Sequence, residues 1–430
     1  MPDTVAASTM DAVSKTTHPP GEPSATPAPT GPWQDRNFRW LWSGMCVSTL
    51  GSHTAGIVYP LLVLALTHSP EIVGWVTALR ITPFVLLCLP VGAMIDRWDR
   101  RRVMLWCDLG RCLTVGSLPL AFVWREPTLA HIVVVAVVEG TLMVFYNLAE
   151  VAALPRVVAR PHLPQASALN QAGFAVAGIA GPALGTTLYQ VSRALPFAAD
   201  ALSYAISAFT LWRLRGDFSA TPATAPRQLG AEIMTGLRWL WHEKIVRRMA
   251  MLTGGMNFVE ASVPLLLIVM AQQMGASAVE IGLIFSAGGI GGVLGALVGG
   301  RIQRHFSFGQ VILGVVVLQA LLYPLYALSP SPLWLGVVYG VMEFLGPVYN
   351  VVQFSHRIAL IPQGLEGRVN AGYRFIAHAL NPAGAALCGV LIERVGAVYS
   401  LAFFAAVFVA LAMAALASRT IRHEPTLAGR

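Results

Sequence analysis

Three glutamates lie within long apolar runs of this sequence, where an ionisable side chain is costly. Glu139, Glu260 and Glu343 each fall near the middle of a run of about 20 apolar residues, the length that spans a bilayer. A carboxyl group enclosed by lipid and protein gains and loses a proton near physiological pH, as a proton carrier must. Alternatively, such a group binds a cationic substrate or pairs with a base. The three residues therefore predict a site for proton coupling or for a substrate.

Other polar side chains share these runs and belong to the same candidate cavity. Arg80 needs an acid on a neighbouring helix, because an unpaired cation inside the membrane is costly. A lone histidine such as His53 more often packs through hydrogen bonds than carries protons. The cavity residues also include Asn147, Asn257 and Asn350.

Two further charged features have a structural interpretation. Asp108 and Arg111 are three residues apart, so on a helix they face each other and pair locally. Asp200 lies close to the end of its run, and we interpret it as structural.

The elements that must position these groups are membrane-spanning helices. The chain of 430 residues is 55% hydrophobic and only 12% charged, which indicates a membrane protein. Lipid leaves no partner for an open backbone, so each span is a helix. The fold class is therefore all-α with twelve transmembrane helices, at about 40–66, 71–95, 103–124, 128–153, 168–190, 196–214, 249–272, 279–300, 309–328, 333–354, 370–392 and 397–418.

The charge distribution predicts how the chain is oriented in the membrane. The net charge is +8, but most Lys and Arg lie in alternate loops, and the other loops contain only Arg125, Arg193 and Arg394. By the positive-inside rule both termini are cytoplasmic, in a multi-pass protein of the plasma or inner membrane. Because the basic residues serve orientation, we do not expect a nucleic-acid partner.

The composition of the chain predicts where its parts begin and end. We expect a disordered cytoplasmic tail (1–32), a six-helix bundle (33–215), a cytoplasmic linker with an amphipathic surface helix (216–248), a second six-helix bundle (249–418) and a short tail (419–430). The two bundles repeat each other at a shift of 200–207 residues. The repeated residues are Glu139 with Glu343, Asn147 with Asn350, Pro155 with Pro362, and Pro182 with Pro382.

The loop between the second and third spans reads Gly92-Ala-Met-Ile-Asp96-Arg97-Trp98-Asp99-Arg100-Arg101. It resembles the signature of the major facilitator superfamily of secondary transporters, departing from it only where Asp99 replaces a glycine. The resemblance implies two pseudo-symmetric six-helix bundles around a cavity that opens alternately to either side.

The acid in this loop has a possible electrostatic role. Asp96 could hold a cytoplasmic gate closed against the positive end of the eleventh helix, near Arg368, while Arg97, Arg100 and Arg101 tie the loop to acids or phosphates. The alternative is that these arginines only determine topology. In the second copy Gln303 replaces the acid, so such a lock is one-sided.

The fifth span favours export over uptake. Its small residues Gly178, Gly181, Pro182 and Gly185 let helices approach closely, and they resemble the Gly-Pro motif of exporters in this superfamily. Residues 147–212 resemble the branch that contains macrolide-efflux proteins and enterobactin-type siderophore exporters.

The sequence contains no phosphate-binding loop and no hydrolase motif, so we expect neither an enzyme nor direct use of ATP. The five cysteines lack metal-ligand spacing, and we expect no metal or cofactor. We predict a monomeric transporter that exports an amphiphilic small molecule in exchange for protons. The alternatives are an uptake symporter or lysolipid carrier of the same fold, and a membrane scaffold or sensor that transports nothing.

Overall fold

The computed structural model describes residues 31–95, 97–216, 218–219, 229–362 and 364–422. Helices account for nearly all of them, and this described part of the chain contains no strand. Ten spans are long and apolar enough to cross a membrane. Two further helices, α4 and α7, are also long, but they carry the charged residues Asp108, Arg111 and Asp200. The helices match the twelve predicted runs, and the predicted all-α membrane fold is confirmed.

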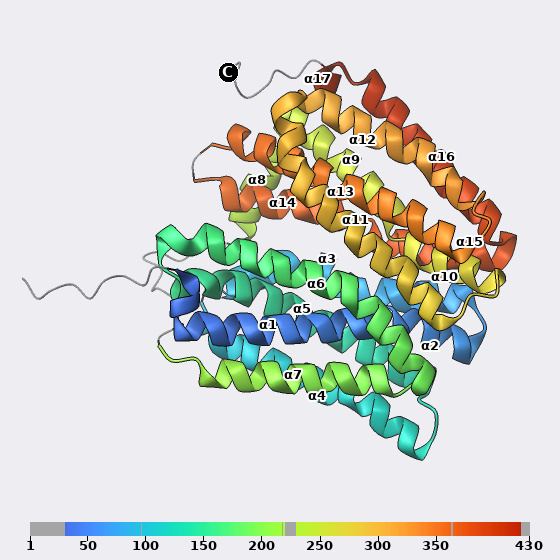
Figure 1. Ribbon diagram of the computed structural model, residues 1–430. Helices are drawn as coiled ribbons and strands as arrows, with labels where there is room; N and C mark the ends of the chain where they lie inside the picture. The colour runs from blue at the N-terminus through green and yellow to red at the C-terminus, as the bar shows by residue number, and fades with distance from the viewer. Residues whose placement is uncertain (1–30, 96, 217, 220–228, 363, 423–430) are drawn as a thin grey trace, which may run out of the picture.

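The first half of the chain forms one bundle of helices (Figure 1). After a short 3-10 turn (Pro32–Gln34), it comprises α1 (Arg36–Gly56), α2 (Val58–Thr67), α3 (Pro70–Ile95), α4 (Arg100–Trp124), α5 (Leu129–Val157), α6 (Leu163–Val191) and α7 (Leu195–Arg213). A second short 3-10 turn (Arg160–His162) precedes α6. Helices α1 and α2 together make one span.

The second half forms a similar bundle (Figure 1). It comprises α8 (Leu229–His242), α9 (Lys244–Glu260), α10 (Val263–Gln273), α11 (Ala278–His305), α12 (Phe308–Leu322), a 3-10 turn (Tyr323–Tyr326), α13 (Pro332–Leu360), α14 (Glu366–His378), α15 (Asn381–Val395), α16 (Ala397–Ala417) and α17 (Arg419–Arg422). Two pairs, α9 with α10 and α14 with α15, make single spans.

Three spans break at a position that a proline dictates. A proline lacks the backbone N–H that would bond to the carbonyl four residues earlier. Helix α1 ends at Gly56, four residues before Pro60; α9 ends at Glu260, four before Pro264; and α14 ends at His378, four before Pro382. Breaks inside membrane spans free backbone groups at mid-depth, where transporters place their binding sites.

The halves meet through two helix pairs, α3 with α15 and α6 with α11. The contacts lie toward the end of the bundle that carries Pro70 and Glu393, which we call the closed face. There Gly74 and Gly389 pack so tightly that a Cβ on Gly389 would lie 2.9 Å from the Cα of Gly74. Toward the other end, the terminal face, where the described chain begins, α6 and α11 diverge (Figure 1).

Candidate functional site

Glu139 is neutralised by an ion pair inside the first bundle. Arg80 on α3 donates to Glu139 on α5 through Nη2 to Oε1 at 2.9 Å and through Nε to Oε2 at 3.3 Å. The Glu139 side chain is only 1% exposed, and the Tyr59 ring lies 4.8 Å from the Arg80 guanidinium carbon. Next to the pair, Gly140 packs directly against the backbone of Arg80. Arg80 thus has the acidic partner that the sequence requires, and Glu139 serves as a counter-ion.

Glu260 and Glu343 have no such base. Glu260 is the last residue of α9, at the break before α10, and its side chain is exposed. Gln319 lies beside Glu260, and Tyr339 beside the half-buried Glu343. Among the described residues no basic side chain pairs with either glutamate.

Glu260 acts electrostatically on Glu343. Two carboxylates without a base beside them repel each other when both are ionised. The arrangement therefore suits uptake and release of a proton, or binding of a cation.

Asn257 belongs to a second polar group, at the break between α14 and α15. Its Nδ2 donates to the carbonyl of Ala377 at 2.8 Å and lies 3.4 Å from Nδ1 of His378. Asn381 approaches the same nitrogen at 3.3 Å. Phe84 of α3 packs edge-on against the His378 ring at 5.5 Å. Contact between the halves therefore extends from the closed face to about the middle of α3.

His53 lies three residues before the end of α1, and its side chain is solvent-accessible. The glycines of α6 explain why this helix comes so close. A Cβ on Gly181 would lie 2.5 Å from Cβ of His53, and one on Gly185 would lie 2.1 Å from the carbonyl of Thr54.

Gly178 and Pro182 lie on the side of α6 that contacts α11. The carbonyl of Gly178 abuts Gly289 of α11, and that of Pro182 abuts Gly282. Pro182 is buried and lies inside an unbroken helix. The predicted Gly-Pro motif thus packs α6 between α1 of its own half and α11 of the other.

The gate residues are only partly described, because Asp96 lies outside the described residues. Gly92 is half-buried and Arg97 is exposed. Arg101 donates to the carbonyls of Leu211 at 2.9 Å and Trp212 at 2.5 Å, at the end of α7. Arg100 donates to the carbonyl of Phe218, from its backbone at 3.3 Å and its guanidinium at 3.4 Å. Both arginines thus hold the start of α4 to the end of α7 and to the segment after it, and contacts with acids or phosphates stay a prediction.

Asn147 and Asn350 stand apart from these groups. Asn147 is half-buried on α5, and Asn350 is exposed on α13. Neither makes a hydrogen bond to the other candidate residues that the structure describes.

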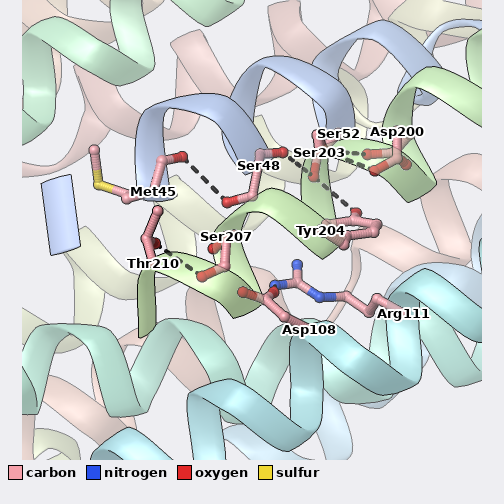
Figure 2. Close-up of polar contacts among 10 residues, drawn as sticks. All are labelled: Met45, Ser48, Ser52, Asp108, Arg111, Asp200, Ser203, Tyr204, Ser207 and Thr210. Atoms are coloured by element: carbon pink, nitrogen blue, oxygen red, sulfur yellow. Dashed lines mark hydrogen bonds and ion pairs between the residues drawn. The ribbon is translucent and has the colours of Figure 1, made fainter. Parts of the chain in front are cut away.

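A buried network that the sequence did not predict as a unit links α1, α4, α5 and α7, and Figure 2 shows its members on α1, α4 and α7. The expected local pair is present, with Arg111 donating to Asp108. The Arg111 guanidinium lies between two rings, 4.4 Å from that of Tyr146 and 4.3 Å from that of Tyr204. The Tyr204 hydroxyl is 2.9 Å from Oγ of Ser52.

The second bundle contains a comparable network. Thr253 of α9 lies 2.8 Å from the hydroxyl of Tyr349 and 2.7 Å from that of Tyr373. The Arg357 guanidinium carbon lies 3.8 Å from the Tyr373 ring centre. Recurrence of Tyr146 as Tyr349 in the repeat was the sequence signal that could have revealed both networks.

Comparison with known proteins decides the family. The model of the transmembrane secretion effector family, MFS_3, matches residues 27–427. The chain belongs to this family of the major facilitator superfamily. It is therefore a membrane transporter and not an enzyme, as the resemblance in the loop from Gly92 implied.

Two curated relatives are similar over most of their length. The enterobactin exporter EntS of Shigella boydii serotype 4 (strain Sb227) is 26% identical over 84% of this chain and 85% of its own. The multidrug efflux pump Tap of Mycolicibacterium fortuitum is 27% identical over 79% of this chain and 85% of its own.

Solved structures share the fold. The nucleoside transporter NupG superposes with a TM-score of 0.72 at 14% identity, covering 89% of this chain and 98% of its own. The human organic anion transporter MFSD10 (TETRAN) gives 0.64 at 15% identity, covering 89% and 99%.

Proposed function

We propose that this transporter exports an amphiphilic small molecule, such as a drug, a macrolide-like compound or a siderophore, in exchange for protons. The names of the relatives EntS and Tap support export, since one is an enterobactin exporter and the other a multidrug efflux pump. Exchange for protons rests on the side chains of the second bundle.

The observation that carries proton exchange is the pair Glu260 and Glu343. Among the three glutamates predicted from the sequence, these two have no basic partner within the described chain, and Glu260 is exposed at the break between α9 and α10. An acid in this position binds a proton or a cation, but not both at once. Competition between the two is the simplest way to couple proton entry to the exit of a substrate.

The conformation is consistent with loading from the cytoplasm. With both termini cytoplasmic, the closed face is the outer one and the halves diverge toward the cytoplasm. Asp96, Arg97, Arg100 and Arg101 then form the gate that must close at the terminal face before the outer side opens. A single chain carries every element of this cycle, and we propose a monomer.

Transport in proteoliposomes tests the function. The protein is reconstituted with its orientation determined, and accumulation of a fluorescent amphiphilic dye is followed with and without an imposed pH gradient. We expect the gradient to drive the dye toward the outer side. Glu260→Gln and Glu343→Gln should each abolish gradient-driven accumulation while downhill movement persists. Glu366→Gln, at the exposed start of α14, is the matched control and should behave as wild type.

Each alternative gives a different result. An uptake symporter moves the dye in the opposite sense under the same gradient. A lysolipid carrier moves a labelled lysolipid and not the dye. A scaffold or sensor moves neither compound.

A further inference from the structure

Asp200 is a fully enclosed acid in the first bundle, and its position in the sequence indicated only a structural role. It is 0% exposed on α7. Its Oδ1 lies 3.5 Å from the Ser203 hydroxyl, and its Oδ2 receives no hydrogen bond within the described chain. Gly51 of α1 covers it so closely that a Cβ there would lie 2.7 Å from Oδ1. Figure 2 shows Asp200 facing α1 beside Ser203 and Tyr204.

The charges around Asp200 leave it without a counter-ion. The ionisable groups that act on it from neighbouring elements are Arg80 of α3, Arg111 of α4 and Glu139 of α5, together with Tyr204 of its own helix. Tyr59 of α2 is also coupled to it, and His53 of α1 is coupled to Arg80.

The two arginines near Asp200 each form an ion pair with another acid. Arg80 pairs with Glu139, and Arg111 pairs with Asp108. The two ion pairs carry no net charge, so an ionised Asp200 would be an uncompensated buried charge. Ionising such a carboxyl without a partner is costly, and any change in its charge requires that a proton leave or enter.

A second buried acid in this bundle provides a contrast. Glu150 accepts a hydrogen bond from the Asn170 amide at 2.9 Å and lies nearer the terminal face. Asp200 receives no comparable donor on Oδ2. Of the two acids, only Glu150 accepts a hydrogen bond from a side-chain amide within the described chain.

Two hydroxyl groups close to Asp200 lead toward solvent-accessible space. Tyr204 lies one helical turn along α7 from Asp200, and within the described chain no hydrogen bond joins its hydroxyl to the carboxyl. The Tyr204 hydroxyl is 2.9 Å from Oγ of Ser52 on α1, and Ser52 is half-buried beside the accessible His53. Hydroxyl groups both donate and accept hydrogen bonds, so a rotation that brings the Asp200 carboxyl to Tyr204 would complete a route for a proton.

We propose that Asp200 is a second proton carrier of the exchange cycle, located in the first bundle, while Glu260 and Glu343 serve the second. This inference rests on the proposed proton exchange. In the release step the carboxyl O–H bond breaks, the proton leaves through the two hydroxyl groups to water, and a carboxylate remains near Arg80 and Arg111. Uptake is the reverse, and no other bond changes.

Infrared spectroscopy of the purified protein tests whether Asp200 holds the proton, independently of transport. We expect a protonated-carboxyl band in the wild-type spectrum that Asp200→Asn removes and that Glu260→Gln, on the other bundle, leaves in place. Tyr204→Phe should keep the band but slow its exchange in deuterated water at least tenfold, because it removes the hydroxyl but not the ring. An unchanged band in Asp200→Asn would overturn the proposal.

Transport and stability supply the second readout. In proteoliposomes Asp200→Asn should lose at least tenfold in gradient-driven dye accumulation and retain downhill movement. Wild-type accumulation in this variant would overturn the proposal. Because asparagine resembles a neutral carboxyl, thermal unfolding should be unchanged, and a marked loss of stability would overturn it by showing that the fold needs the carboxylate ionised. If the wild type shows no response to pH, the proposed function fails, while the infrared band still reports whether Asp200 is protonated.

Discussion

Adding one methyl group at Gly389 should shift the transporter away from the conformation in which the closed face is sealed. A Cβ at this position would lie 2.5 Å from the carbonyl oxygen of Pro70, 2.9 Å from Cα of Gly74 and 3.1 Å from Cα of Glu71. All three atoms belong to the backbone of α3, so no side chain can rotate away to relieve the clash. Relief requires α3 and α15 to separate, which is the movement that opens this face.

The size of the shift follows from the cost of overpacking. Inserting a methyl group into a well-packed contact costs about 1–3 kcal/mol. If only the sealed conformation bears this cost, the equilibrium moves by roughly 5- to 150-fold toward the conformation open at this face. Gly314→Ala is the matched control, since a Cβ at Gly314 on α12 would meet no atom within 4 Å.

Distances between paired spin labels measure the shift, in a variant whose five cysteines are replaced. One pair, on Ser192 and Met274, reports on the closed face, and another, on Arg160 and His305, reports on the terminal face. In Gly389→Ala we expect the first pair to separate and the second to approach, and in Gly314→Ala neither should change. Unchanged distances in Gly389→Ala, with wild-type thermal stability, would show that α3 and α15 do not form the seal.

Three further substitutions probe single interactions. Glu393 accepts a hydrogen bond from Ser69 at 2.9 Å, just before α3 begins. Glu393→Gln should weaken this contact by about 0.3–1 kcal/mol. The equilibrium should then shift up to about fivefold toward the conformation open at the closed face, as measured by the distance between the labels on Ser192 and Met274. Glu139→Gln should cost about 3–5 kcal/mol by leaving Arg80 unpaired, and adding Arg80→Met should restore most of the thermal stability in detergent. Thr253→Val leaves two tyrosine hydroxyls without this partner and should lower the free energy of unfolding by about 1–3 kcal/mol.

The spans and the need for an acid beside Arg80 were predictable because both follow from the cost of placing polar groups in lipid. Hydrophobicity determines which segments cross the membrane. An arginine inside the membrane is costly without an acidic partner, so a partner is required even though the sequence does not say where it lies. Pro60, Pro264 and Pro382 each identify the carbonyl that loses its hydrogen bond at a break. Because Pro182 lies inside an unbroken helix, a proline alone does not specify which spans break.

Which of the three membrane glutamates is paired with a base was not predictable in the same way. Glu139, Glu260 and Glu343 look equivalent in the sequence, because each lies near the middle of an apolar run. Whether a base reaches one of them depends on the rotation of neighbouring helices, which a single sequence does not specify. For the same reason the sequence did not specify that Arg101 contacts the carbonyl oxygens at the end of α7.

The internal repeat explains why one glutamate is neutralised and its counterpart is not. The shift of 207 residues that relates Val91 to Val298 places Ala287 of α11 where the first half has Arg80. A Cβ at Gly340 would lie 3.9 Å from the Ala287 methyl group, one helical turn before Glu343 on α13. The second half therefore lacks the base that neutralises the acid in the first.

Restoring that base should convert Glu343 into a counter-ion. We expect Ala287→Arg to abolish the response of transport to an imposed pH gradient, because a guanidinium beside Glu343 keeps its carboxylate ionised. Ala287→Gln, which adds a polar side chain of similar reach without the charge, should retain the response. If both variants fold and both retain it, the acid at 343 does not carry the proton, and the asymmetry between the halves has no part in coupling.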